Sequence, residues 1–394
     1  MTYNFDIIQN RKGTNSVKHD LHEKCGKPAG LIPLWIADMD FKAPIEVETA
    51  LIQCAKHGIF GYSEAGDGYW EAVRNWFWDG FGYRPEREWL VMAPGVVFAV
   101  TMAIRAFTDE GDSVMIQRPV YHPFAEVIND NNRRVINNPL VYENGKYRVD
   151  FDDFEQKIVQ NKVELFILCS PHNPVGRVWT VDELEKMGDI CLKHGCIVVS
   201  DEIHCDFVYV PHRHHVFSMV KPEFADNSVI CTAPSKTFNT PGLQVSNTFI
   251  QNPELRRRLI KECDASGYSQ MNTMGLAACE AAYRHGREWL GQLLAYLSGN
   301  MDLVYEFGDR AGIRPVPLEG TYLAWLDFSP LKLSPGELDD FIIKKAGLWL
   351  SPGVTYGGEE GAVFQRINIA SPRSVLARAL RRLESAVTNG RMRG

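Results

Sequence analysis

The middle of this chain alternates short apolar runs with amphipathic segments, and this alternation limits what the chain can fold into. Six apolar runs cover residues 89–92, 113–117, 164–169, 196–200, 228–232 and 247–250. Segments with helical periodicity lie between them, including residues 97–108 and 181–194, and the second opens with the capping box Thr180 and Glu183. Strands that alternate with helices predict a mostly parallel sheet, and strands that are apolar throughout predict helices on both of its faces.

The sequence pattern changes after about residue 290. Residues 290–308 predict one long helix, and residues 320–327 predict a strand with alternating Tyr322 and Trp325. The first 45 residues are rich in loop-forming residues and are too poor in regular patterns to fold alone. We therefore predict an α/β protein with a large domain at residues 46–288 and a smaller domain. An N-terminal arm (1–45) and residues 289–394 make up the smaller domain.

The composition limits the kinds of partner and compartment that we expect for this protein. A net charge of −7 argues against a nucleic-acid protein, because a phosphate backbone selects a basic surface. No apolar run is long enough to span a membrane, and the first residues lack the pattern of a secretion signal. Nine cysteines without a Cys-x-x-Cys pair are typical of buried side chains in a reducing compartment. We expect a cytoplasmic protein without a metal site, and we interpret His212-Arg213-His214-His215 as an exposed loop.

Two ionisable residues follow predicted strands at the edge where open α/β sheets bind ligands. Lys236 comes shortly after residues 228–232, where partial desolvation would lower its pKa and favour imine formation with a carbonyl cofactor. Asp201 follows residues 196–200, and a carboxylate buried there needs a cation such as a protonated pyridine nitrogen. Each residue alone also has a simpler interpretation: a surface lysine for Lys236, and a helix cap or salt bridge for Asp201.

Further residues fit a site at the same edge. Asn173 lies in a Pro- and Gly-rich turn, where its amide can bond a ring oxygen of a cofactor. The backbone N–H groups of Val96 and Val97, at the start of a predicted helix, suit a phosphate. Tyr121 offers a face for stacking on a planar ring, and Arg366 in an apolar strand needs an anion such as a substrate carboxylate. The competing role is a tight turn for Asn173, ordinary packing for Tyr121 and a structural salt bridge for Arg366.

Taken together, the ordered motifs resemble fold-type I pyridoxal-phosphate enzymes of the class I/II aminotransferase group. These motifs are Asn-Pro-x-Gly from Asn173, Asp-Glu-Ile-His from Asp201, Ser-Lys-Thr-Phe-Asn from Ser235 and Arg-x-Asn-x-Ala from Arg366. The likeness covers essentially the whole chain. Residues 33–41, 60–62, 118–124 and 200–204 are most similar to the MalY/PatB-type cystathionine β-lyases, also called cysteine C–S lyases. The resemblance implies a PLP-dependent transferase-like fold, with a mostly parallel seven-stranded sheet in the large domain and a smaller α/β domain.

The resemblance also implies a role for each residue. Lys236 would hold pyridoxal 5′-phosphate as a Schiff base, Asp201 would pair with its pyridine nitrogen, and Tyr121 would stack on its ring; these three are the expected catalytic residues. The other expected cofactor-binding residues are Asn173, His204, Val96, Val97, Ser235 and Tyr62, and the expected substrate-binding residues are Arg366, Ala37 and Asn173. Tyr62 would reach the phosphate of a neighbouring subunit, which implies a homodimer with shared active sites. Gln244 occupies the place of a phosphate-binding arginine found in many aminotransferases.

The implied reaction is β-elimination at the C–S bond of a small amino-acid substrate, which gives pyruvate, ammonia and a thiol. Lys236 would remove the α-proton. The same residues would also serve transamination, so the motifs leave an aminotransferase as the alternative. A regulatory protein that keeps the fold and binds a transcription factor is a third hypothesis. We favour the lyase because of the family resemblance.

Overall fold

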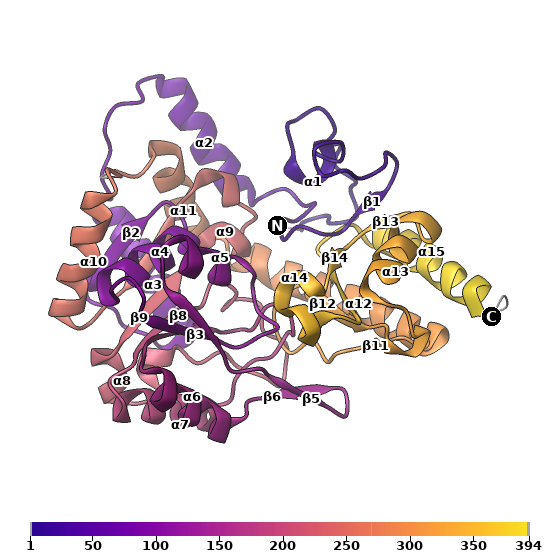
Figure 1. Cartoon of the computed structure of the whole chain (residues 1–394). Helices are drawn as coiled ribbons and strands as arrows, with labels where there is room; N and C mark the ends of the chain where they lie inside the picture. Colours follow the sequence, from indigo (N-terminus) through magenta and orange to yellow (C-terminus); the bar gives the residue numbers. More distant parts are fainter. Residues whose placement is uncertain (1, 269, 392–394) are drawn as a thin grey trace.

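The centre of the molecule is a seven-stranded sheet, described by a computed structural model that covers residues 2–268 and 270–391 (Figure 1). In spatial order its strands are β2 (Leu90–Ala93), β10 (Ser246–Phe249), β9 (Ser228–Thr232), β8 (Ile197–Asp201), β7 (Val163–Cys169), β3 (Ser113–Ile116) and β4 (Arg134–Asn137). Only β10 runs antiparallel to its neighbours. The predicted fold class, with its mostly parallel seven-stranded sheet, is confirmed.

The central strands are apolar throughout because both faces of the sheet are covered. On β7, Leu165 and Ile167 pack into one hydrophobic cluster, whereas Phe166 and Leu168 pack into the other. The first cluster includes side chains of α4 (Val96–Phe107), α5 (Pro123–Asp130) and α10 (Pro253–Ala265). The second includes side chains of α3 (Asp67–Phe81), α6 (Phe151–Asn161), α7 (Val181–Lys193) and α11 (Thr273–His285). Alternate side chains of a strand thus enter opposite layers, as the pleat requires.

The predicted elements of this region agree with the structure within one residue at each strand end. The capping box is present, because the Thr180 side chain accepts from Glu183 N–H and Glu183 reaches back. The seventh strand, β4, was not predicted. It lies at the sheet edge with only partly buried side chains, and it opens with the exposed Arg134, so it lacks the apolar pattern of the inner strands.

A second sheet lies in the C-terminal part of the chain. Its antiparallel strands are, in order, β11 (Arg314–Pro315), β12 (Leu323–Asp327), β15 (Phe364–Asn368) and β14 (Ser351–Pro352). The helices of this part include α12 (Arg287–Ala311), α13 (Pro335–Asp340), α14 (Val354–Gly357) and α15 (Arg373–Arg391). The strand expected at residues 320–327 begins only at Leu323, because Thr321 N–H bonds the Phe207 carbonyl at 2.8 Å instead of extending the strand.

The N-terminal arm lies against the C-terminal part, although the two are far apart in sequence (Figure 1). Strand β1 (Ile32–Pro33) pairs in parallel with β13 (Leu348–Trp349), and α1 (Val17–Asp20) precedes it. Helix α2 (Ile45–His57) then leads into the large part. This contact agrees with placing the arm and the C-terminal residues in one small domain. The boundaries at residues 45 and 288 stay a prediction.

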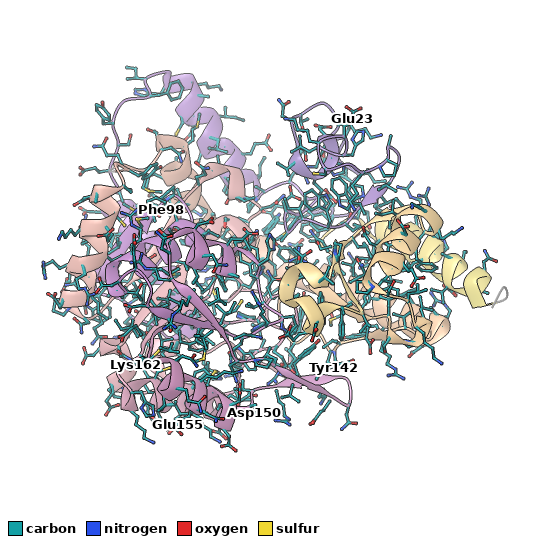
Figure 2. The ribbon with its side chains drawn as sticks, viewed as in Figure 1. Glu23, Phe98, Tyr142, Asp150, Glu155 and Lys162 are labelled. Atoms are coloured by element: carbon teal, nitrogen blue, oxygen red, sulfur yellow. The ribbon has the colours of Figure 1, made fainter. Side chains whose placement is uncertain are left out.

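A hairpin of the large part also reaches the C-terminal part. Its strands are β5 (Val141–Glu143) and β6 (Lys146–Arg148). Tyr142, labelled in Figure 2, donates its hydroxyl to Asp327 Oδ2 at 3.3 Å. The hairpin therefore joins the large part of the molecule to the second sheet.

The His212-to-His215 run is only partly the exposed loop that we predicted. His212 and Arg213 are exposed, but His214 is buried, with Nε2 2.8 Å from Glu202 Oε2. Glu202 is fully buried, so its carboxylate requires this partner. Among the described residues no group of three potential ligands is arranged to hold a metal ion, and no helix there is long and apolar enough to cross a membrane.

Candidate active site

A cavity of about 640 Å³ lies where the carboxyl ends of the parallel strands face the arm and the second sheet. Strands β2, β3, β7, β8 and β9 all end at this edge, which explains why polar residues far apart in sequence meet there. The cavity is lined by these residues singled out from the sequence: Ala37, Val96, Val97, Tyr121, Asn173, Asp201, His204, Ser235, Lys236 and Arg366.

Lys236 is held inside the cavity and is not the surface lysine of the simpler interpretation. It lies on the short helix α9 (Pro234–Thr237), directly after β9, and its Nζ donates to the Ala37 carbonyl at 3.1 Å. Burial and then the charge of Arg366 lower the Lys236 pKa to about 8, although Asp38 and Asp201 act in the opposite direction. About a tenth of this amine is therefore uncharged at pH 7, far more than of an ordinary lysine, and the uncharged form is the one that a nucleophile or base requires.

Asp201 ends strand β8, is buried and lines the cavity. Its Oδ1 accepts from the Ile203 N–H at 3.1 Å. Burial raises the pKa of this carboxyl to about 7, and the nearby Lys236 only partly opposes the shift. No helix begins next to Asp201, and no cationic side chain of the described residues forms an ion pair with it, so neither a helix cap nor a salt bridge accounts for this residue. Glu202 takes separate partners, Ser200 and His214, so the two carboxylates do not form one metal site.

Arg366 comes from β15, and its guanidinium is buried. Nη1 donates to Asn173 Oδ1 at 2.9 Å, and Nη2 donates to the Trp35 carbonyl at 2.7 Å. Nε is buried without a hydrogen-bond partner in the part of the chain that the structure describes. No described carboxylate forms an ion pair with Arg366, so the structural salt bridge is wrong. The geometry instead holds the guanidinium by neutral oxygens and leaves its positive charge for an anionic ligand.

The remaining lining residues offer neutral donors and aromatic surface. His204 is buried with Nδ1 unpartnered among the described residues, and burial, followed by the charges of Lys236 and Arg366, keeps its pKa well below the usual value. Burial raises the pKa of Tyr121 to about 12, so its phenol stays protonated. Val96 and Val97 begin α4, where the first backbone N–H groups of a helix have no partner within the helix.

Tyr62 does not reach this cavity. Its side chain is 96% exposed, beside the exposed Phe60, and it borders a separate surface depression with Tyr268 and Met271. Within one chain, the structure therefore brings together the other predicted site residues but not this one. The role of Tyr62 in a neighbouring subunit stays a prediction.

Several residues that shape the cavity were not predicted from the sequence. Trp35 stacks on Trp349 with ring centroids 4.4 Å apart and planes 7° apart, and both line the cavity with Tyr356 and His122. Ser351 pairs in register with Arg366 across β14 and β15. One usable signal was present: residues 348–353 are an apolar run followed by a Ser-Pro-Gly turn, the same pattern that marked the other site residues.

Comparison with known proteins agrees with this geometry. A family model described as aminotransferase class I and II matches residues 31–383. The chain is 41% identical to the cystathionine beta-lyase PatB of Bacillus subtilis, over 98% of this chain and 100% of that protein. It is 34% identical to the protein MalY of Escherichia coli, over 98% and 99% of the two chains.

The solved structures include a similar molecule. Cystalysin from Treponema denticola, whose crystal structure contains a pyridoxal 5′-phosphate cofactor, superposes with a TM-score of 0.95 at 36% identity. The match covers 99% of this chain and 100% of that one. With the family model spanning most of the sequence and full-length relatives well above 30% identity, the chain belongs to the aminotransferase class I and II family.

Proposed function

We propose that this protein is a pyridoxal-phosphate-dependent carbon–sulfur lyase that cleaves L-cystathionine or related cysteine S-conjugates. One observation carries the proposal: Lys236, Asp201 and Arg366 converge in a single cavity, in a chain that matches a cystathionine beta-lyase over its full length. The reaction is L-cystathionine plus water to homocysteine, pyruvate and ammonia. The C–S bond breaks, sulfur keeps the electron pair and takes up a proton, and water replaces the amino nitrogen.

The residues present fit pyridoxal 5′-phosphate. A buried acid without a paired cation, Asp201, suits a protonated pyridine nitrogen, which would also return the carboxyl to its ionised form. The amide nitrogen of Asn173 and the unpartnered Nδ1 of His204 are suited to the polar substituents of the ring. The free N–H groups at the start of α4 suit the phosphate. When bound at Lys236, this cofactor supplies an electron sink for the α-carbon of an amino acid.

The protein's own groups then orient the substrate and move its protons. Arg366 would hold the α-carboxylate, which directs the α-carbon toward the Lys236 amine. With a pKa of about 8, Lys236 Nζ can take the α-proton as a free amine and return a proton to the leaving sulfur. The stacked Trp35 and Trp349 provide an apolar wall that excludes water from part of the cavity.

An aminotransferase would use the same residues, so the test must score products. The purified holoenzyme should be incubated with L-cystathionine, with an S-alkyl cysteine and with an aromatic amino acid plus a 2-oxo acid. We expect free thiol and pyruvate in equal amounts from the first two substrates. Amino-group exchange in the third mixture, without thiol release in the others, would establish the aminotransferase instead.

Replacing Arg366 by lysine is expected to raise KM for cystathionine by about 10- to 100-fold, with a smaller change in kcat. Lysine keeps the positive charge but cannot make the planar, two-point contact with a carboxylate. Steady-state kinetics would check this, with Arg105→Lys as a control because Arg105 pairs with Glu262 at the surface. An unchanged KM in the Arg366 variant would exclude the proposed carboxylate contact.

We further propose a homodimer in the cytoplasm. The exposed Ile59, Phe60 and Tyr62 support a contact with a second copy, and free, mostly buried cysteines support a reducing compartment. If Tyr62 serves the neighbouring site, Lys236→Ala and Tyr62→Ala variants should regain activity when mixed and allowed to exchange subunits. Lack of complementation, or a monomer in sedimentation, would oppose the shared site. Cell fractionation tests the location.

A further inference from the structure

A compact group of charged residues connects the N-terminal arm to the loop behind Lys236. It consists of Arg11, Lys18 and His19 from the arm, together with Asp38 and Asp40, and we call it the arm cluster. Figure 2 labels Glu23, which belongs to the same arm. None of these five residues entered the site predicted from the sequence.

The cluster is densely paired, with Lys18 and Asp40 buried and the other three residues partly buried. Lys18 is fully buried, and its Nζ lies 2.8 Å from Asp40 Oδ2 and 3.7 Å from Asp38 Oδ1. Arg11 bridges the same two carboxylates, through Nη1 to Asp40 at 2.9 Å and through Nη2 to Asp38 at 2.5 Å. Burial alone would raise the Asp40 pKa, but Lys18, His19 and Arg11 together hold it well below its usual value. The Asp40 carboxylate is thus held in the ionised form.

The two carboxylates flank the loop that faces the site. The Ala37 carbonyl, next to Asp38, accepts from Lys236 Nζ at 3.1 Å and from the Tyr322 hydroxyl at 2.8 Å. The loop backbone is also held by Asn239, which bonds Met39 N–H and the Met39 and Phe41 carbonyls. Asn239 lies three residues after Lys236, so the same loop contacts both the catalytic amine and the segment that carries it.

The second sheet holds the loop from the other side. Asn368, two residues after Arg366, donates from Nδ2 to the Ile36 and Asp38 carbonyls, each at 2.7 Å. Ser371 donates its hydroxyl to Asp40 Oδ2 at 3.0 Å. The loop is therefore anchored from the large part, from the second sheet and from the arm. Of these anchors only the arm cluster uses full charges.

We propose that the arm cluster is a positioning device for the reaction: it fixes the Ala37 carbonyl against the Lys236 amine and keeps the Asp38 charge beside that amine. The inference rests on the proposed function, in which Lys236 moves the α-proton. Held by one hydrogen bond to a fixed carbonyl, the amine presents its lone pair in a constant direction. Lys18, Arg11 and Asp40 act through the loop and are positioning residues.

Burial energetics favour a positioning role over a purely stabilising one. Removing an ammonium group from water is costly, and apolar residues of similar volume often replace a buried ion pair without loss of stability. A fully buried Lys18 is thus a poor choice for stability alone. Ion pairs do, however, fix geometry, because each added contact restricts where the partner carboxylates can lie.

The charged groups around Lys236 define what should change. Arg366 lowers its pKa, Asp38 and Asp201 raise it, and the buried His204 stays uncharged. Replacing Asp38 by asparagine removes one of the two charges that stabilise the ammonium form. The Lys236 pKa should then fall by about 0.5 pH units, in the direction given by Coulomb's law.

The test uses the cofactor-free full-length chain, where Lys236 can be titrated directly. The rate of its reaction with an amine reagent is followed against pH by mass spectrometry of the peptide that contains it. We expect a lower apparent pKa in Asp38→Asn than in the wild-type chain. An unchanged pKa in that variant would overturn the inference, and this readout does not depend on lyase activity.

A double variant separates positioning from stability. Lys18→Met alone leaves Asp40 buried with fewer cations and should lower the melting temperature. In Lys18→Met/Asp40→Asn both charges are gone, so much of the melting temperature should return, while kcat of the holoenzyme stays about 10-fold low with little change in KM. The matched control is Ile158→Ala, which removes a buried side chain of α6; this helix lies at the bottom of Figure 1, well away from the N-terminal arm at the top.

Each outcome has one meaning. Recovery of both stability and kcat in the double variant would show that the cluster only stabilises the fold and would overturn the inference. If a stability loss in Ile158→Ala lowers kcat equally, the effect on rate is not specific to the loop, and the inference is also overturned. Absence of thiol release by the wild-type enzyme would defeat the proposed function, whereas the titration of Lys236 in the cofactor-free chain would still decide the electrostatic part.

Discussion

Replacing Lys236 by alanine is expected to reduce thiol release from cystathionine by at least about 10³-fold, because the variant loses both the nucleophile that holds the cofactor and the base that moves the α-proton. Borohydride reduction of the wild-type holoenzyme, followed by mass spectrometry, should find the cofactor attached at Lys236 alone. The control is Lys193→Ala, since Lys193 is exposed and pairs with Glu155. Near-normal thiol release by the Lys236 variant would exclude its catalytic role.

The same lysine predicts the pH dependence of the rate. In the cofactor-free chain its pKa is about 8, so the free amine, the form that accepts the α-proton, increases as the pH rises through that value. We therefore expect kcat to increase with pH and to level off above about pH 8. A kcat that falls steadily between pH 6 and pH 8 would indicate that another group removes the proton.

Replacing Asp201 by asparagine is expected to lower kcat by about 10²- to 10³-fold, because the neutral amide no longer stabilises a protonated ring nitrogen. The substitution keeps the size and shape of the side chain, so the fold should persist. Steady-state kinetics on the reconstituted variant, with cofactor content measured in the same sample, would check this. Activity within a few-fold of wild type would mean that the ring nitrogen needs no anionic partner here.

The same substitution, which should lower activity, is expected to raise the stability of the cofactor-free protein. In the cofactor-free chain its pKa is raised from the usual range near 4 to about 7, so the folded form binds more protons than the unfolded form between these values. The free energy of unfolding should therefore fall as pH rises from 4 to 7. The cofactor-free Asp201→Asn variant does not titrate at this position. Between pH 4 and pH 8 its free energy of unfolding should therefore rise by about 1–3 kcal/mol relative to that of the wild-type chain. Denaturant unfolding at both pH values measures the difference, and an equal pH dependence of the two proteins would contradict the raised pKa.

Much of the fold was predictable because its strongest signals are local. The inner strands are buried on both faces, so their sequences are almost continuously apolar, and each could be placed within one residue. The rule that ligands bind at the carboxyl ends of such strands then located the site. Lys236, Asp201 and Asn173 were found in this way, from their positions after β9, β8 and β7.

The features that were not predicted from the sequence have a common physical cause, because they depend on contacts between segments far apart in the chain. The edge strand β4 has no apolar pattern because one side of it faces solvent. Trp35 and Trp349 form one wall of the cavity only because β1 pairs with β13, some 300 residues later. Lys18 carries no local signal, because its ion-pair partners Asp38 and Asp40 lie 20 and 22 residues further along the chain.

The burial of His214 also depends on a contact that the local sequence does not reveal. His214 lies in a run of basic residues, which predicts solvent exposure, but in the structure it is buried against Glu202. A carboxylate after a buried strand was recognised as costly at Asp201 but not at its neighbour. The partner that each of them takes differs: the His214 side chain for Glu202, and in our proposal a ring nitrogen for Asp201.

Our central claim is that this site catalyses β-elimination of a thiol from the substrate and does not exchange amino groups. The most direct test is the number of pyruvate molecules formed per active site when the holoenzyme meets L-cystathionine without any added 2-oxo acid. Elimination regenerates the starting enzyme in each cycle, so we expect many turnovers, with thiol and pyruvate in equal amounts. Transamination alone would stop after one amino acid per site and release no thiol, and that result would contradict the account.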